Sequence, residues 1–144
     1  MVEAVDIYPT LAELAGLAAP VGLDGTSFSS LVRDPKRPGK DIALSQFARP
    51  FKPTDPEFMG YSIRTSDGYR YNRWVEWATK KPVHEELYCY GKGQYDEIRD
   101  WPMLIELENM IDHPEYAQVR ERLRTRMDRV LRERLAWTEI PQRR

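Results

Sequence analysis

The chain has 144 residues, 22 basic and 23 acidic side chains, and a mean hydropathy of −0.67. This length fits one domain, or one domain with a loosely attached end. The near-balance of charge excludes a general electrostatic attraction to nucleic acid or to an anionic membrane, and no apolar run approaches the roughly 20 residues that cross a bilayer. The first residues lack the basic and apolar regions of a secretory signal, so we expect no export signal in this sequence.

Residues 6–16 are predicted to form a short amphipathic helix. Pro9 lies in its first turn and Gly16 is a stop signal at its end. The spacing of Ile7, Leu11 and Leu14 gives this helix one apolar face. Residues 18–40 contain three prolines and three glycines, which predict a surface connection with at most one helical turn near residues 27–31.

A small antiparallel sheet is predicted next. Residues 41–47 read as a strand, and residues 49–57 as a proline-containing loop that cannot pair regularly. Two further strands flank Asp67-Gly68, a strong hairpin signal because Gly68 can take the positive φ of a tight turn. Residues 85–90 predict a fourth strand. Large side chains on both faces of the hairpin suggest that a helix packs on one side, and a partner or the sheet's own aromatic rows on the other.

The best helix prediction begins at Pro114 and Glu115. Its apolar residues recur at three- and four-residue steps over about five turns; they are Tyr116, Val119, Leu123, Met127, Val130, Leu131 and Leu135. The predicted fold class is therefore α+β: a small, roughly four-stranded antiparallel sheet packed by a C-terminal helix, with a short N-terminal helix. Residues 91–109 show no pattern to which we assign a function.

The chain offers few groups for catalysis. Cys89 is the only cysteine, which excludes an intrachain disulfide, and its place at the end of a strand favours a packed or surface thiol. His84 and His113 fall in no metal-ligand pattern. A Gly-x-Ser-x-Gly motif and a phosphate-binding glycine loop are both absent from the sequence. We therefore expect neither a catalytic residue nor a metal ligand in this chain.

Several segments together resemble a known family. They are VDIYPTLAELAG at residues 5–16, LDGTSF and LVRDP within residues 23–35, SQFARP at 45–50, MGYSIRT at 59–65 and ELY at 86–88. This set resembles the C-terminal subdomain of sulfatases of the alkaline phosphatase superfamily, nearest to the iduronate-2-sulfatase-like branch. The resemblance implies that residues 1–40 are the end of the N-terminal domain and a connection, and that residues 41–144 are the C-terminal subdomain.

The resemblance also implies a parent reaction, the hydrolysis of a sulfate ester through a formylglycine hydrate with Ca²⁺ polarising the sulfate. In the family the formylglycine forms in a Cys-x-Pro-x-Arg motif of the N-terminal domain, which also holds the Ca²⁺. Cys89 is followed by Tyr90 and Gly91 and does not match. We therefore expect no cofactor in this chain, the missing sulfatase N-terminal domain as its partner, and a sulfated small molecule or sugar as the parent's substrate. The family is usually periplasmic, extracellular or lysosomal.

The substrate-binding candidates are Gln46, Arg49, Met59 and Gly60, with Ser45 beside them; Met59 and Gly60 are expected in a loop at residues 57–60. In the iduronate-2-sulfatase-like branch this surface faces the mouth of the active site, and the resemblance implies contacts to an anionic sugar. Arg49 suits such a role because its planar guanidinium pairs with carboxylate or sulfate. The alternative is that Gln46 and Arg49 only tie the proline-containing loop to the sheet.

Three further readings stay open. The tyrosines and tryptophans of the hairpin pack the sheet or offer a platform for sugars. The arginines of the C-terminal helix form a solvated face, with Asp128 and Arg132 at a favourable spacing, or bind a polyanion. The chain completes a sulfatase pocket and is inactive alone, or it is a non-catalytic protein-interaction module that uses the face of Ile7, Leu11 and Leu14.

Overall fold

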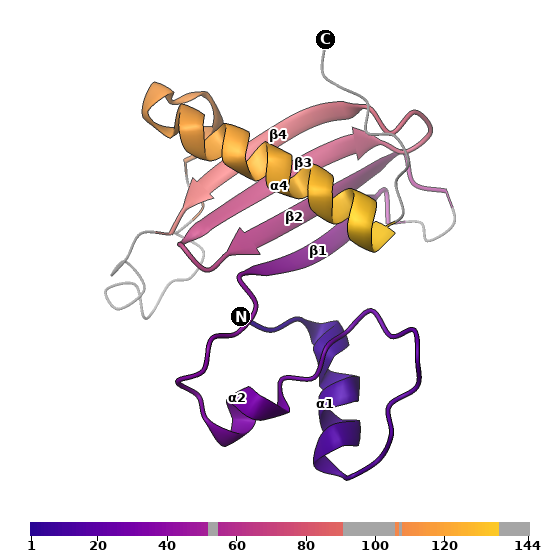
Figure 1. The fold of residues 1–144 in the computed structure, drawn as a ribbon. Coiled ribbons are helices and arrows are strands. Elements are labelled where there is room, and N and C mark those ends of the chain that lie inside the picture. The colour runs from indigo at the N-terminus through magenta and orange to yellow at the C-terminus, as the bar shows by residue number, and fades with distance from the viewer. Residues whose placement is uncertain (52–54, 91–105, 107, 136–144) are drawn as a thin grey trace. The chain divides into compact units, whose positions relative to one another are not determined.

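The computed structural model describes residues 1–51, 55–90, 106 and 108–135. The chain divides into two compact units, Met1–Ala43 and Leu44–Arg144 (Figure 1). That these units are the end of a sulfatase N-terminal domain and its C-terminal subdomain stays a prediction. None of the described helices is long and apolar enough to cross a membrane.

The first unit is built from three short helical elements. They are η1 (Ala4–Asp6), α1 (Ile7–Leu14) and α2 (Ser29–Arg33). α1 ends because Gly16 adopts a φ of +70°, and the N–H groups of Gly16 and Leu17 donate to the carbonyls of Glu13 and Ala12. This pair of bonds satisfies carbonyls at the helix end and confirms the stop predicted at Gly16.

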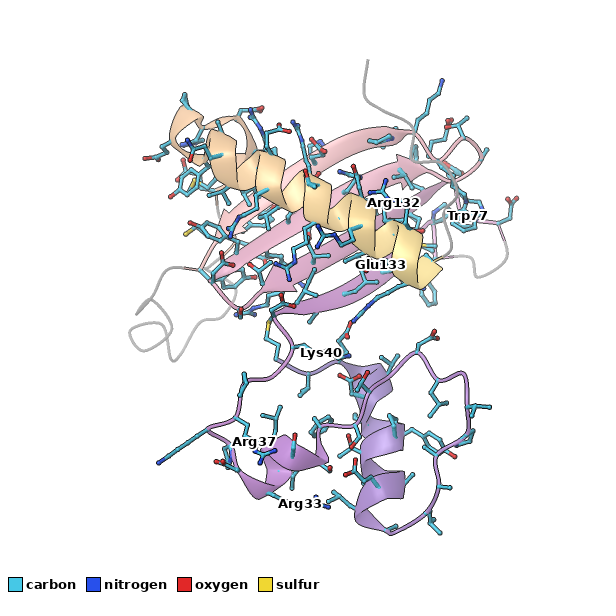
Figure 2. All side chains as sticks on the ribbon, viewed as in Figure 1. Arg33, Arg37, Lys40, Trp77, Arg132 and Glu133 are labelled. Atoms are coloured by element: carbon cyan, nitrogen blue, oxygen red, sulfur yellow. The ribbon has the colours of Figure 1, made fainter. Side chains whose placement is uncertain are left out.

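Asp6 holds the first unit together. Its side chain is 1% exposed and accepts hydrogen bonds from the N–H groups of Glu3 and Thr26, both at 2.8 Å. The ammonium of Lys40, a residue labelled in Figure 2, donates to Asp6 at 2.6 Å and to Glu3 at 2.5 Å. Thr10 extends this network, because its hydroxyl donates to the Asp6 carbonyl and accepts from the N–H of Phe28. Asp6 and Thr10, two prominent residues of the VDIYPTL segment, therefore have structural roles.

The network around Asp6 predicts a loss of stability in acid. Burial alone would raise the pKa of Asp6, but the Lys40 ammonium and the two N–H donors lower it below its ordinary value of 3.8. A carboxyl with a lowered pKa in the folded state contributes stability above its unfolded pKa and loses it as the pH falls through the folded pKa. We expect the NMR amide signals of Thr26 and Phe28 to report loss of the fold of this unit below pH 3.8. A midpoint above pH 3.8 would contradict this reading, and Asp6→Asn should flatten the dependence.

The second unit contains the predicted four-stranded antiparallel sheet. Its strands are β1 (Ile42–Arg49, which begins at the last two residues of the first unit), β2 (Phe58–Thr65), β3 (Tyr69–Glu76) and β4 (Pro82–Cys89), in the spatial order β1-β2-β3-β4. The hairpin between β2 and β3 is confirmed: Gly68 has a φ of +90°, and its N–H donates to the Thr65 carbonyl at 3.2 Å. The strands extend beyond the expected bounds, since Arg49 still belongs to β1 and Met59 and Gly60 belong to β2. Met59 and Gly60 therefore lie in a strand, whereas the sequence predicted a loop for them.

The C-terminal helix covers one face of the sheet (Figure 1). Two 3-10 turns, η3 (Met110–Asp112) and η4 (Pro114–Tyr116), lead into α4 (Ala117–Leu135), as the start signal at Pro114 predicts. Residues of 0–2% exposure from both layers form the core; they are Tyr61, Ile63, Tyr71, Val75, Leu87, Leu123, Met127 and Leu131. The predicted apolar stripe is thus confirmed. Tyr61 and Tyr71 pack the sheet and are not available as a platform for sugars.

A buried ionic cluster also lies between the sheet and α4. Arg73 and Glu85 are cross-strand partners, with side chains 5% and 3% exposed, and their charged groups are 3.7 Å apart. The Arg124 guanidinium reaches Glu85 at 2.5 Å, the Tyr71 hydroxyl donates to Glu85 at 2.5 Å, and Arg73 pairs with Asp128. Burial alone would raise the pKa of Glu85, but Arg124 and the Tyr71 hydroxyl lower it.

The arginines of α4 are therefore not simply solvated. Arg120 donates to the carbonyl of Ile111 at 2.7 Å, Arg122 pairs with Asp67 at 2.7 Å, and Arg124 pairs with Glu85. Asp128, expected to face Arg132 along the helix, instead pairs with Arg73 of β3. Several basic side chains of this helix thus have partners within the protein, which leaves less of its charge for a polyanion.

One side chain occupies the edge of β4. The Asn109 carboxamide accepts from the N–H of Leu87 at 2.9 Å and donates to the carbonyl of Glu85 at 3.4 Å. Its oxygen also accepts from the N–H of Ile111, and so caps η3. The Asn109 side chain therefore imitates a neighbouring strand at two positions of β4.

Candidate functional site

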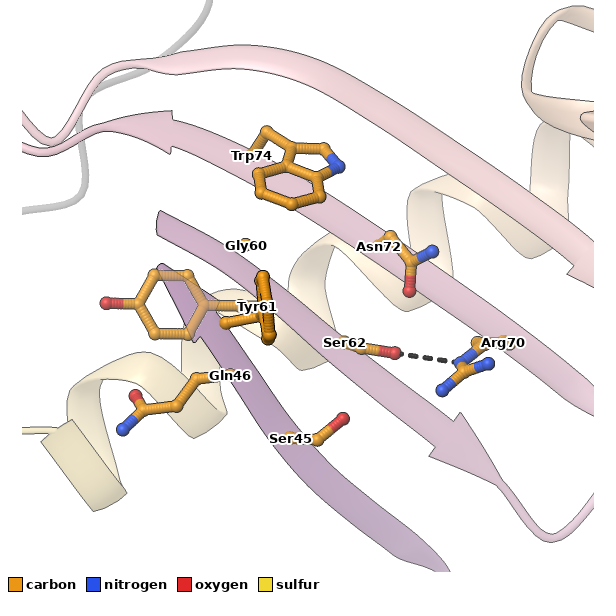
Figure 3. A pocket seen from close by; sticks show the side chains of 9 residues that line it. Ser45, Gln46, Gly60, Tyr61, Ser62, Arg70, Asn72 and Trp74 are labelled. Atoms are coloured by element: carbon orange, nitrogen blue, oxygen red, sulfur yellow. Dashed lines mark hydrogen bonds between the residues drawn. The ribbon is translucent and has the colours of Figure 1, made fainter. Parts of the chain in front are cut away.

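The face of the sheet turned away from α4, here called the outer face, carries a hollow of about 350 Å³ (Figure 3). Three strands line it, with Ser45, Gln46 and Phe47 from β1, Gly60, Tyr61 and Ser62 from β2, and Arg70, Asn72 and Trp74 from β3. Gly60 and Trp74 are register partners, and so are Ser62 and Asn72. The hairpin thus places residues 60, 62, 72 and 74 on this one face, because alternate residues of a strand point to the same face.

Trp74 forms a broad apolar wall of this hollow. The ring lies against Gly60, where an added Cβ would meet three carbons of the indole at 2.9–3.0 Å. A side chain at position 60 would therefore displace the indole. Gly60 is needed for the close approach of Trp74 and not for an unusual φ.

Asn72 presents an unused acceptor. Its amide nitrogen donates to the Glu86 carboxylate at 2.7 Å, and this fixes the orientation of the amide because a carboxylate only accepts. The amide oxygen is buried, and it has no hydrogen-bond partner among the described residues. Figure 3 shows this oxygen on the side of Ser62 and Arg70. A buried acceptor without a partner is costly, so this atom is a point where a ligand could bind.

Arg70, in contrast, is already paired. Its guanidinium donates to the Ser62 hydroxyl at 3.0 Å, to Glu106 at 2.6 Å and to the Tyr90 hydroxyl at 3.4 Å. Burial alone would lower the pKa of Arg70, but the pair with Glu106 raises it. Burial, followed by the hydrogen bond to Glu106, raises the pKa of Tyr90 to about 12. The positive charge of Arg70 is therefore balanced within the protein.

A second hollow of about 380 Å³ adjoins the first and shares Trp74 with it. Its other lining residues are Arg49, Phe58, Val83 and His84. The Arg49 guanidinium lies over the Phe47 ring, 4.7 Å from its centroid, and His84 lies 3.6 Å from Glu86. This hollow is more apolar than the first and carries a cationic group at its border.

The four predicted substrate-binding residues fall in different places. Gln46 and Gly60 line the first hollow, whereas Arg49 lines the second. Met59 pairs in register with Val75 and lines neither of these two hollows. The structure thus brings Gln46 and Gly60 together and leaves the binding role of all four a prediction. Ser62, Asn72 and Trp74 were not singled out as one site from the sequence.

The described part of the chain contains no group of three or more His, Cys, Asp or Glu placed to hold a metal ion. His113 lies 3.3 Å from Glu108 and 4.0 Å from Glu115, and Cys89 is half-buried at the end of β4. These residues do not fit the Ca²⁺ of a sulfatase, so no step of a reaction is assigned to a metal held by this chain.

Comparison with known proteins finds similarity to sulfatases of the iduronate-2-sulfatase branch. It is similar to human iduronate 2-sulfatase, with 39% identity over 105 residues, which covers 52% of this chain and 19% of that protein. The mouse iduronate 2-sulfatase is 37% identical over a stretch of the same length and coverage. No family model matches the chain. The chain spans about a fifth of the length of these relatives, and its likeness to the iduronate-2-sulfatase branch, expected from its motifs, is confirmed.

Proposed function

We propose that this chain is the C-terminal subdomain of a sulfatase of the alkaline phosphatase superfamily, inactive alone, and that it completes a substrate pocket when joined to a catalytic N-terminal domain. The observation that supports this most directly is the position of the first hollow. It is lined by residues of the segments at 45–50 and 59–65, two of the segments that resemble sulfatases, together with residues of β3. Those segments therefore converge on one concave surface of the outer face.

The chemistry of sulfate ester hydrolysis would come from outside this chain. A formylglycine and a Ca²⁺ ion, bound by the N-terminal domain, would supply the nucleophile and polarise the sulfate. Arg49 would lie at the border of the substrate pocket, where a guanidinium pairs well with carboxylate or sulfate. The substrate would be a sulfated sugar or another sulfate ester.

A complementation experiment tests the proposal. We would combine the purified chain with human iduronate 2-sulfatase that lacks the segment to which this chain is similar, and follow hydrolysis of a fluorogenic iduronate 2-sulfate. We expect no turnover by either piece alone and measurable turnover by the pair. Turnover by this chain alone, or neither binding nor turnover with the partner, would contradict the proposal.

A second candidate function, a non-catalytic protein-interaction module, is favoured by one observation. The apolar side chains of α1 lie at the surface, with Ile7 51%, Leu11 60% and Leu14 45% exposed. Contiguous apolar side chains on a surface mark a site of association. In the same experiment, Leu11→Glu should abolish binding if this face holds the partner. Tight binding of the unmodified chain without any turnover would favour this second function.

A further inference from the structure

We propose that the first hollow of the outer face binds an uncharged sugar ring, stacked on Trp74 and hydrogen-bonded to Asn72. This inference rests on the proposed function, because the ring would be the neighbour of the sulfated unit in the parent enzyme's substrate. It adds that the two sugar units bind at different places: this hollow binds the neutral ring, and the anionic unit lies outside it. Four observations carry it.

The first is the balance of charge around the hollow. Arg70 is the one cation among the nine described lining residues, and Glu106 pairs with it at 2.6 Å. A second carboxylate, Glu86, lies against the Asn72 amide at 2.7 Å. A sulfate or carboxylate entering this hollow would thus find no unpaired positive charge in the described lining, and it would lose its hydration.

The second is the set of hydrogen-bonding groups that remain. The buried Asn72 oxygen has no partner in the described structure and can accept from a ligand hydroxyl. Ser62 accepts from Arg70 and keeps its own hydroxyl hydrogen for donation. Ser45 adds another hydroxyl on the same lining. Neutral donors and acceptors at several points match a ligand that carries several hydroxyl groups.

The third is the Trp74 surface. One side of the indole lies on Gly60, and the ring lines both hollows. The face of an aromatic ring is electronegative, so the weakly positive C–H groups of a pyranose pack well on it. The rigid support from the Gly60 backbone holds this platform in place before a ligand binds.

The fourth is size. The hollow of about 350 Å³ lies at the lower end of the range of about 300–1,000 Å³ that is typical of small-molecule sites. A single ring with its hydroxyl groups suits this volume, whereas a longer glycan would have to extend into the second hollow beyond Trp74. The neighbouring unit would then meet the border formed by Arg49 and His84.

The experiment uses two probes that differ only at C6, methyl glucopyranoside and methyl glucuronopyranoside, titrated into the ¹⁵N-labelled chain. We expect the neutral probe to shift the indole signal of Trp74 with a Kd on the order of 1 mM, about −4 kcal/mol. The glucuronoside should bind at least about tenfold more weakly, a difference of 1.4 kcal/mol. Tighter binding of the glucuronoside would overturn the proposal. No shift with the neutral probe at about 50 mM, far above such a Kd, would also overturn it.

Variants locate the binding. Asn72→Ala should weaken binding of the neutral probe about fivefold, since it removes one hydrogen bond of about 1 kcal/mol. Trp74→Leu lacks the indole signal, so binding to this variant is followed through the backbone amide signals of Ser62 and Asn72, which should no longer shift. Trp77→Leu, whose ring lies beside Lys80 and outside both hollow linings, is the matched control. If the Asn72→Ala and Trp74→Leu variants bound the neutral probe as tightly as the unmodified chain does, the assignment to this hollow would be overturned. Because this readout needs no catalytic partner, sugar binding without complementation would contradict the proposed function alone.

Discussion

Replacing Glu85 with alanine is expected to lower the free energy of unfolding of the sheet and α4 by about 3–5 kcal/mol. Glu85 is the shared acceptor of Arg124 and the Tyr71 hydroxyl and lies 3.7 Å from Arg73, with its side chain 3% exposed. Its removal would leave the buried Tyr71 hydroxyl without this acceptor and would leave Arg73 with Asp128 as its remaining carboxylate partner. Removing one partner of a buried ion pair costs more than the net value of the pair. Urea unfolding followed by circular dichroism measures the change.

Glu121→Ala is the matched control for this prediction. Glu121 also pairs with Arg124, at 2.5 Å, but its side chain is 64% exposed. The control variant should therefore change the free energy of unfolding by no more than about 0.5 kcal/mol. A loss below about 1 kcal/mol for Glu85→Ala would mean that water reaches the cluster and replaces the missing carboxylate.

Gly25→Ala is expected to destabilise the first unit by about 3 kcal/mol or more, the upper end of the cost of overpacking. An added Cβ would lie 1.9 Å from the Val5 carbonyl oxygen and 2.5 Å from its carbon, and neither backbone atom can rotate away. The displaced chain would break the hydrogen bond from the Thr26 N–H to Asp6. Amide hydrogen exchange should show lost protection at Thr26 and Phe28, while the hairpin of the second unit keeps its protection.

Gly22→Ala separates crowding from backbone strain. Gly22 has a φ of +82°, but no atom lies within 4 Å of a Cβ added there. Alanine at this position should cost only about 1 kcal/mol, the penalty of a left-handed backbone. Equal loss of protection in the two variants would show that the close approach of the Val5 backbone is not the reason why position 25 requires glycine.

The sequence predicted the elements well because each had a local signal. Asp67-Gly68 specifies the hairpin, Gly16 ends α1, and the three- and four-residue spacing places Leu123 and Met127 in the core. The ends of β1 and β2 were less predictable. Pairing between strands carries Arg49, Met59 and Gly60 into the sheet despite the prolines between them, and such pairing has no local sequence signal.

The candidate site was harder to predict because its parts meet only through tertiary structure. Glu106 pairs with Arg70 although 36 residues separate them in the sequence, so neither segment alone predicts that the charge of Arg70 is neutralised. Alternation did contain one usable signal: Gly60 and Ser62 share a strand face, and the hairpin register sets Trp74 and Asn72 opposite them. By the same alternation Arg73 shares a strand face with Tyr71 and Val75, but its partner Asp128 lies 55 residues away.

The Asn109 side chain has a consequence for self-association. A sheet grows by adding a strand at an exposed edge, and many proteins aggregate in this way. At β4 the backbone groups of Leu87 and Glu85 are already bound by the Asn109 amide, so an incoming strand would have to displace it. One carboxamide thereby occupies backbone groups of β4 that a strand of another molecule could otherwise bind. Asn109→Ala would free these groups, and we expect this variant to polymerise more readily.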